Sequence, residues 1–301
     1  MASFGVLGPG GVGGFLAAAL ERAGETVTVV ARDETAALID RDGIAVESVR
    51  LGHFTARPAA RAALEEEVDV LFVATKATGL GAALARIAVE PRLTVPLLNG
   101  LDHMQVLRSR FERVAAGTIR IEADRPAPGK IVHTSPFLRI DLAARDAGVA
   151  ALLPPVVAVL ERAEVPARIG PSEAQILWSK LVRLNALAST TSACDRPIGF
   201  IRSDPEWRAA LIGCIEEGAA VARADGAEIE MGTPLGELEQ AHPGLGSSMQ
   251  RDIAAGRVPE LDAIQGAVLR AGARHGIDCP TVARLAAVIA ARAGLPPLRV
   301  E

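Results

Sequence analysis

The sequence predicts an α/β fold, in which a doubly wound parallel sheet is followed by an all-helical C-terminal domain. Three observations predict it. Short apolar runs alternate with amphipathic helical stretches through the first half of the chain, which is typical of a parallel sheet. A glycine-rich turn directly follows the first apolar run. Beyond Gly170 the strand patterns stop and long helical patterns take over. We therefore expect two domains, residues 1–170 and residues 171–301.

Four apolar runs in the first half have the length and composition of buried parallel strands. They are Ser3–Leu7, Thr26–Ala31, Val68–Ala74 and Thr94–Leu98. The helical patterns between or after them are Gly11–Ala23, Glu34–Arg41, Gly79–Ala88 and Asp102–Arg110.

At the end of the first domain, strand-like segments follow one another closely instead of alternating with helical patterns. We expect three of them to extend the sheet as antiparallel strands: Arg113–Ile119, Lys130–Thr134 and Phe137–Leu142. A helix over Gly148–Ala163 and a short strand over Val165–Ile169 follow.

The second domain begins with a capping box, because Ser172 is followed by Gln175 three residues later. In one of its helices, the spacing of four apolar residues predicts a single buried face; these are Leu261, Ile264, Val268 and Leu269. The expected helices are Glu173–Ala193, Pro205–Asp225, Glu260–His275 and Pro280–Ala293.

Composition excludes several classes of protein. A formal net charge of −4 and a pI near 5.8 argue against a protein that binds nucleic acid through phosphate contacts. The uncharged run Ala147–Leu160 is too short to cross a bilayer, and the N-terminus has no basic, export-like start. Three widely spaced Cys and five scattered His give no metal-ligand spacing and suit the cytoplasm.

A glycine motif of the form GxGxxG lies between the first strand and the first helix. The first glycine allows a tight turn, the second lets the backbone approach a pyrophosphate, and the third lets helix and strand pack closely. The free N–H groups of the helix N-terminus favour an anion there. The sequence therefore predicts a dinucleotide site in a Rossmann-type domain, at Gly8, Pro9, Gly10, Gly11, Val12 and Gly13.

The residue after the second strand bears on which dinucleotide binds. Units that bind NAD usually place an acid there to hold the ribose hydroxyls, whereas a cation suits the 2′-phosphate of NADP. This chain has Arg32 at that position, followed by Asp33. We expect NADP or NADPH; in the alternative, Arg32 is solvated and Asp33 holds the ribose.

Lysine is scarce, since only three of the 32 basic residues are Lys, namely Lys76, Lys130 and Lys180. Arg cannot give up a proton near neutral pH, whereas Lys can. The surviving lysines are therefore candidates for a chemical role, although a base-composition bias alone would also leave a few. Lys130 precedes a strand and is expected at the surface.

Five short motifs follow one another along the chain: Gly8–Gly13 with Arg32, Ala74–Lys76, Leu98–Gly100, Trp178–Leu181, and Ser247–Asp252 followed by Gly256, Arg257 and Glu260. Each motif is modest by itself, and their order makes them specific. In these motifs, and in the order and size of its domains, the chain resembles the ketopantoate reductase (2-dehydropantoate 2-reductase) family over essentially its whole length.

The resemblance implies NADPH-dependent reduction of a 2-keto acid to a 2-hydroxy acid, with Lys180 as general acid. A lysine suits that role because hydride addition to a ketone leaves an oxygen that needs a proton. It implies Lys76 and Asn99 at the cofactor, and Glu260 as a second catalytic group. The substrate contacts that we expect are Asn99, Arg183, Asn185, Ser248 and Glu260.

Individually these residues have ordinary explanations. Lys180 could be solvated, Asn99 could belong to a simple Asn-Gly turn, and Ser248 could cap a helix. A first-turn Glu such as Glu260 commonly complements the helix dipole.

The chain departs from the family's usual pattern in the helix that carries Lys180. Much of the family has Asn four and eight residues after this lysine, where the chain has Leu184 and Ala188. Asn185 lies five residues after Lys180, about 140° around a regular helix, unless the helix contains a bulge. The alternatives are therefore the same chemistry on another keto or imino acid, or an NADPH-binding sensor without activity. A homodimer formed through the helical domain is also expected.

Overall fold

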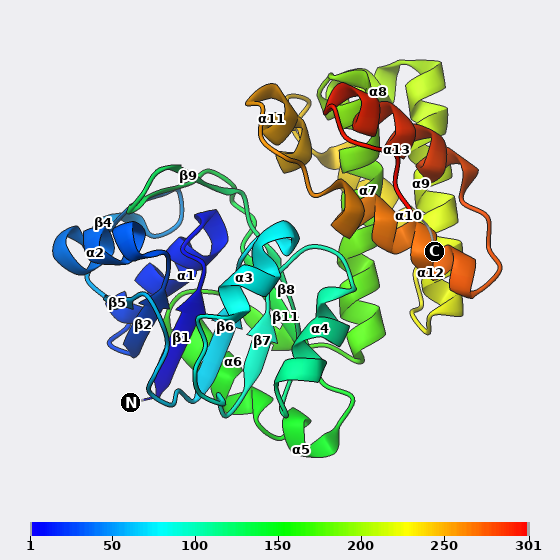
Figure 1. Ribbon diagram of the computed structural model, residues 1–301. Coiled ribbons are helices and arrows are strands. Elements are labelled where there is room, and N and C mark those ends of the chain that lie inside the picture. The colour runs from blue at the N-terminus through cyan, green and yellow to red at the C-terminus, as the bar shows by residue number, and fades with distance from the viewer. Residues whose placement is uncertain (1, 300–301) are drawn as a thin grey trace. The chain divides into compact units, whose positions relative to one another are not determined.

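The structure, a computed structural model, describes residues 2–299. The chain packs as two compact units (Figure 1). The N-terminal unit contains residues 2–98 and 103–176, and the helical unit contains residues 99–102 and 177–299. Packing thus changes between Ile176 and Leu177, inside a helix. The domain boundary expected after residue 170 stays a prediction.

A five-stranded parallel sheet forms the centre of the N-terminal unit. Its strand order is β5-β2-β1-β6-β7, and every neighbouring pair is parallel. The prediction of a doubly wound parallel sheet is confirmed. The strands are β1 (Ser3–Leu7), β2 (Thr26–Val30), β5 (Ala59–Arg61), β6 (Val70–Val73) and β7 (Thr94–Pro96).

Helices cover both faces of this sheet (Figure 1). One face shares a continuous apolar core with α1 (Gly11–Arg22) and α6 (Leu153–Arg162), in which Phe4 stacks on Phe72 of the neighbouring strand. The other helices of the unit's first half are α2 (Asp33–Asp42), the short 3₁₀ helix η1 (Ala77–Gly79), α3 (Leu80–Leu84) and α4 (His103–Arg110).

A second sheet, with the strand order β4-β3-β10-β9, packs on the outer side of α1. The strand expected over Lys130–Thr134 exists as β10, but its place in the main sheet was predicted wrongly. It pairs in parallel with β3, where Lys130 forms an ion pair of 3.0 Å with Glu47. The sheet's strands are β3 (Ile44–Ser48), β4 (Gly52–Ala56), β9 (Ala123–Ala127) and β10 (Lys130–His133).

A third sheet, with the order β12-β11-β8, continues the main one through a parallel bridge between Thr94 and Val114. The segment that leads into β8 (Ala116–Arg120) thus joins the main sheet in parallel, so the expected antiparallel direction is wrong for this strand. It is right for β11 (Arg139–Ala143), which pairs antiparallel with β8. The third strand, β12 (Ala167–Ile169), pairs in parallel with β11.

The helix expected over Gly148–Ala163 is in fact two helices, α5 (Ala147–Ala150) and α6. Pro154 and Pro155 occupy the first turn of α6. Proline fits a first turn because it needs no N–H partner there, so the pair starts a new helix where the sequence pattern alone suggested continuity.

The helical unit is all-helical, as predicted, and α9 packs against α8, α10, α12 and α13. The short helices α8, α10 and α11 were missed, because they are too short for a clear helical period. The helices are α7 (Glu173–Cys194), α8 (Ile198–Ser203), α9 (Pro205–Ala224), α10 (Gly232–Gln240), α11 (Ser248–Ala254), α12 (Ala267–Arg274) and α13 (Pro280–Arg292).

Two local predictions for the helices can be checked. Ser172 Oγ accepts a hydrogen bond of 3.0 Å from the Gln175 backbone N–H, which confirms the serine half of the capping box. The predicted apolar face from Leu261 to Leu269 is buried. Its backbone over Asp262–Gly266 is a π-helix, η2, rather than the expected α-helix.

Residues 2–299 contain no helix that is both long and apolar enough to cross a membrane. Within the same residues, no group of three or more His, Cys, Asp or Glu side chains is arranged to hold a metal ion.

Candidate active site

The glycine motif forms the turn between β1 and α1, and two of its glycines are required sterically. Gly8 has φ +90°, a conformation that side chains rarely adopt, and an added Cβ would lie 2.7 Å from Thr75 Cγ2. A Cβ on Gly13 would lie 2.2 Å from the Gly8 carbonyl oxygen. Gly8 therefore makes the tight turn and Gly13 lets α1 pack closely on β1, the roles that the sequence predicts for these positions.

Gly10 differs from both, because an added Cβ there would meet no atom within 4 Å. It caps α1 without any side-chain hydrogen bond, and the first turn of the helix contains no acidic residue. No side chain of the described residues therefore competes with an anion as a cap of this helix, although the Gly10 N–H itself donates a hydrogen bond of 2.8 Å to the Gly8 carbonyl. The open space beside Gly10 fits a pyrophosphate that approaches the backbone.

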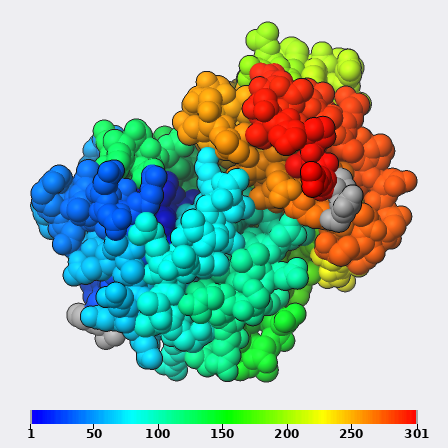
Figure 2. Space-filling view, viewed as in Figure 1, coloured from blue at the N-terminus to red at the C-terminus, as the bar shows by residue number. Residues whose placement is uncertain are grey.

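Two neighbours of the glycine turn were not singled out from the sequence. The Thr75 Oγ1 atom is buried and has no hydrogen-bond partner in the structure. The carbonyl of Ala123, in β9, lies so close to Gly11 that a Cβ there would be 2.0 Å from its oxygen. Figure 2 shows the β9–β10 hairpin at the surface beside the first helices of this unit. The Ala123 contact is made by backbone, so no sequence motif marks it.

The other cofactor residues predicted in this unit follow neighbouring strands. Arg32 comes after β2 and Lys76 after β6, on either side of β1 in the sheet, and both side chains are exposed. Ligands of open α/β sheets bind outside the carboxyl ends of the strands, so these positions suit one dinucleotide. Asp33, the alternative ribose ligand, is the first residue of α2 and lies 3.9 Å from Arg86.

Residues 99–102 are held against the π-helix in the helical unit by three contacts. Asn99 Nδ2 donates a hydrogen bond of 3.0 Å to Glu260 Oε2. A Cβ on Gly100, which has φ +87°, would lie 2.0 Å from the Ala263 carbonyl oxygen. Asp102 forms an ion pair of 2.6 Å with Arg270. Two residues predicted to bind substrate, 161 positions apart, are thereby brought together.

Lys180 and Arg183 lie half-buried on α7, three residues apart. The guanidinium of Arg183 forms an ion pair of 3.0 Å with Glu237 of α10, so Glu237 offsets part of the positive charge beside Lys180. Ser248 is exposed at the first position of α11, whereas the cap of that helix is Ser247, whose hydroxyl accepts from the Gln250 N–H.

Asn185 is the predicted substrate contact that the structure supports least. The helix α7 is continuous from Glu173 to Cys194 and contains no bulge, so Asn185 stays about 140° around the helix from Lys180. Its side chain is fully buried and accepts a hydrogen bond of 3.3 Å from Ser189. Leu184 remains on the Lys180 side of the helix. The role of Asn185 toward substrate stays a prediction.

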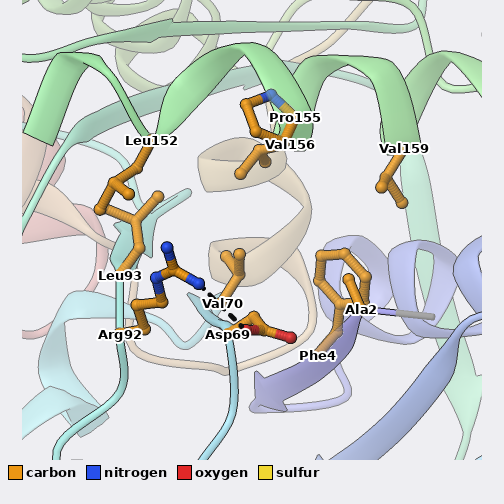
Figure 3. A pocket seen from close by; sticks show the side chains of 10 residues that line it. All are labelled: Ala2, Phe4, Asp69, Val70, Arg92, Leu93, Leu152, Pro155, Val156 and Val159. Carbon is orange, nitrogen blue, oxygen red and sulfur yellow. Dashed lines mark ion pairs between the residues drawn. The ribbon is translucent and has the colours of Figure 1, made fainter.

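A cavity of about 320 Å³ lies elsewhere in the N-terminal unit, at the amino ends of β1 and β6 (Figure 3). Its walls are apolar side chains of the sheet and α6, and Asp69 and Arg92 pair across its rim at 3.9 Å. Because ligands of open parallel sheets bind at the opposite, carboxyl edge, this cavity is separate from the candidate site.

Comparison with known proteins identifies the family. The family model described as ketopantoate reductase PanE/ApbA matches residues 4–146, and its C-terminal counterpart matches residues 174–293. A 2-dehydropantoate 2-reductase of Caulobacter vibrioides is 31% identical over 97% of this chain and 100% of its own length.

Solved structures agree with this. The crystal structure of 2-dehydropantoate 2-reductase from Geobacter metallireducens is 27% identical, with a TM-score of 0.87 over 95% of this chain and 98% of that one. A D-mandelate dehydrogenase complex with NADH has a TM-score of 0.88 over 97% of this chain and 98% of that one; at 18% identity it shows only the shared fold. The chain belongs to the ketopantoate reductase family, a family of NADP-dependent oxidoreductases that act on CH–OH groups.

Proposed function

We propose that this protein reduces 2-dehydropantoate to pantoate with NADPH, and that Lys180 is the general acid. The observation that carries the proposal is the hydrogen bond between Asn99 and Glu260. Family resemblance assigns both residues to the substrate, and folding joins them although neither is near the other in sequence. Lys180 belongs to the same unit.

The N-terminal unit is suited to hold the cofactor. The N–H groups at the start of α1 would bind the pyrophosphate beside Gly10, and Thr75 Oγ1 offers a buried hydroxyl without a partner in the structure. Arg32 would bind the 2′-phosphate, and Lys76 the phosphate side of the cofactor. When bound, NADPH supplies the hydride that the keto carbon receives.

The helical unit would supply the groups that handle the keto acid. The Lys180 ammonium donates a proton to the carbonyl oxygen as the carbon is reduced, and the neutral amine is reprotonated by solvent. Glu260, fixed at Oε2 by Asn99, accepts a hydrogen bond from a substrate hydroxyl. Ser248 and Arg183, exposed and half-buried respectively, are the proposed partners of the substrate carboxylate.

The test is a steady-state assay of the purified protein with 2-dehydropantoate, in which NADPH oxidation is followed by absorbance. We expect saturable turnover and 2-hydroxy acid formed in equal amount to the NADPH consumed. Tight NADPH binding without turnover of any keto acid would instead support the sensor alternative and overturn the proposal.

One observation favours a second candidate, reduction of another keto or imino acid. Since α7 contains no bulge, the apolar Leu184 stands where much of the family has Asn. An apolar pocket wall favours a substrate with an apolar tail over one with a hydroxyl. A panel of 2-keto and 2-imino acids compared by kcat/KM separates the candidates: the second fails if 2-dehydropantoate is clearly the best substrate.

We also propose that the protein is a cytoplasmic homodimer. The three cysteines are free thiols in the structure, which suits a reducing compartment. Phe200 of α8 and Val288 of α13 are exposed apolar side chains of the helical unit that a second copy could cover. Size-exclusion chromatography with light scattering should give twice the mass of the chain if the protein is a homodimer.

A further inference from the structure

A fully buried polar network joins α7 to the π-helix η2 in the helical unit. Ser189 Oγ donates to Asn185 Oδ1 at 3.3 Å and accepts from Gln265 Nε2 at 3.0 Å. All three side chains have no exposed surface. Gln265 is the only one of the three on the π-helix, so its amide is the link between the two elements.

This network is costly for stability. The Asn185 Nδ2 and Gln265 Oε1 atoms are buried without hydrogen-bond partners in the structure. Each such atom loses the hydrogen bond that it makes to water in the unfolded chain, and an apolar side chain of similar shape would avoid that cost. In some proteins a buried polar group selects one structural arrangement over others, as a buried Asn fixes the register of coiled coils. In this protein the network joins α7 to η2, so the arrangement that it selects is the backbone conformation of η2.

The π-helix is the element against which the Asn99 segment docks. Glu260 precedes it, Ala263 within it meets Gly100, and Arg270 after it pairs with Asp102. A π-helix holds one more residue per hydrogen-bonded turn than an α-helix, and α-helical pairing of the same residues is the competing register. A change of register would rotate and shift Ala263 relative to Glu260, and would disturb the pairing of Glu260 with Asn99.

We propose that Asn185, Ser189 and Gln265 are positioning residues, which fix the π-helical register of residues 262–266 and thereby hold Glu260 in place for the keto acid. The hydrogen bond from Gln265 to Ser189 ties one residue of η2 to a fixed point on α7. Asn185 orients the Ser189 hydroxyl so that its lone pair faces Gln265. The catalytic consequence rests on the proposed function, whereas the structural consequence does not.

The chain offers a matched control, Thr190, which neighbours Ser189 on α7. It is equally buried, but its hydroxyl donates to the Ala186 carbonyl of its own helix at 2.8 Å. Thr190→Val therefore removes a buried hydroxyl without touching η2. The test variants are Ser189→Ala, which removes the acceptor, and Gln265→Leu, which removes the donor at similar volume.

The first measurement is amide hydrogen exchange over residues 260–270, which needs no activity. We expect at least tenfold faster exchange there in Ser189→Ala and Gln265→Leu, and no change in Thr190→Val. Unchanged exchange in a folded test variant, or an equal change in Thr190→Val, would overturn the positioning role. Because two different variants remove the same bond, loss of folding in one leaves the other to decide.

The second measurement asks whether the network acts through Glu260. We expect Ser189→Ala to lower kcat/KM for 2-dehydropantoate about tenfold, with the Kd for NADPH unchanged. In a Glu260→Ala background the same substitution should change kcat/KM less than twofold, since the group that it positions is gone. Fully additive effects would overturn the inference. A parent protein that reduces no keto acid defeats the proposed function alone, because the exchange experiment still decides the network's role.

Discussion

Asn99 donates a hydrogen bond to the carboxylate of Glu260, and this bond fixes one of the two oxygens that Glu260 can offer a substrate. Glu260→Gln keeps an acceptor for Asn99 but removes the charge, whereas Glu260→Leu leaves the Asn99 amide without this acceptor. Hydrogen bonds to charged groups contribute about 1.5–3 kcal/mol, so we expect kcat/KM to fall roughly tenfold for Gln and about a hundredfold for Leu. Steady-state kinetics on both variants checks this order. Equal losses would show that the bond to Asn99 has no role.

Lys180 is expected to donate the proton that completes reduction. Lys180→Ala should lower kcat by roughly two to four orders of magnitude, while NADPH still binds with the parent Kd. Lys180→Arg is the informative control, because Arg keeps the positive charge but cannot release a proton near neutral pH. An arginine variant that turns over as fast as the parent would show that charge alone is needed.

Gly10 and Gly13 separate cofactor binding from folding. A methyl group on Gly10 meets no protein atom, so Gly10→Ala should fold normally but weaken NADPH binding about tenfold by filling the space beside the pyrophosphate. A methyl group on Gly13 collides with the Gly8 carbonyl, so Gly13→Ala should lower the Tm by several degrees. Thermal melts and NADPH titrations of both variants give the comparison. A normal NADPH Kd in Gly10→Ala would place the pyrophosphate elsewhere.

Arg32 is expected to select NADPH over NADH. Its guanidinium is exposed after β2, where a 2′-phosphate would lie, and a charge-assisted pair of this kind is stronger than a neutral hydrogen bond. Arg32→Ala should reduce the ratio of kcat/KM values for NADPH and NADH by about ten- to a hundredfold, chiefly through KM for NADPH. If the ratio stays constant, Asp33 becomes the better candidate for the ribose contact.

His133 should make stability depend on pH. Burial, and then the nearby charge of Arg50, lower the pKa of His133 below its usual value of 6.5. Its Nδ1 lies 2.9 Å from the Ser48 hydroxyl in a buried site. Because the unfolded chain takes up this proton more readily, the stability contribution is complete above about pH 6.5 and decreases as the pH falls toward the lowered pKa.

The measurement is the free energy of unfolding by urea between pH 5 and pH 8, in the parent and in His133→Gln. In His133→Gln the free energy of unfolding should fall less steeply below pH 6.5 than it does in the parent. His53→Gln is the comparison variant, because His53 is exposed on β4, and it should change the pH profile less than His133→Gln does. A profile that is identical in all three proteins would contradict the role of His133.

The parts of the fold that could be predicted from sequence are those with a strong local signal. Parallel strands buried on both faces are continuous apolar runs, so β1, β2, β6 and β7 were evident. The hairpin of β3 and β4 has mixed polarity, so the sequence did not predict it. Because β10 pairs with β3, its place in a separate sheet could not be predicted either. The π-helix of residues 262–266 also escaped prediction, because the apolar spacing from Leu261 to Leu269 suits an ordinary helix equally well.

In the candidate site, too, the residues with a local sequence signal could be predicted and those that depend on tertiary packing could not. The roles of Gly8 and Gly13 follow from local backbone sterics, which a short motif encodes. The Asn99–Glu260 pair depends on packing between distant segments, so only resemblance to a family suggested it. Gln265 carried one available signal, since it is a polar residue between Ile264 and Gly266 in an apolar stretch of helix, whereas Ser189 belongs to the polar run Ser189–Ser192 and gave no such signal. Asn185 was placed correctly on α7, but its burial depends on tertiary packing that the sequence does not show.

The three lysines lie in three different environments. Lys76 is exposed and follows β6, Lys130 of β10 forms an ion pair with Glu47 of β3, and Lys180 is half-buried on α7. An amine-reactive label therefore has only three side-chain targets, each in a different peptide after digestion. Lys130 supplies an internal reference, and the labelling of Lys76 and Lys180 relative to it would report occupancy of the proposed cofactor and substrate positions independently. The scarcity of lysine makes the unaltered protein suitable for chemical footprinting by mass spectrometry.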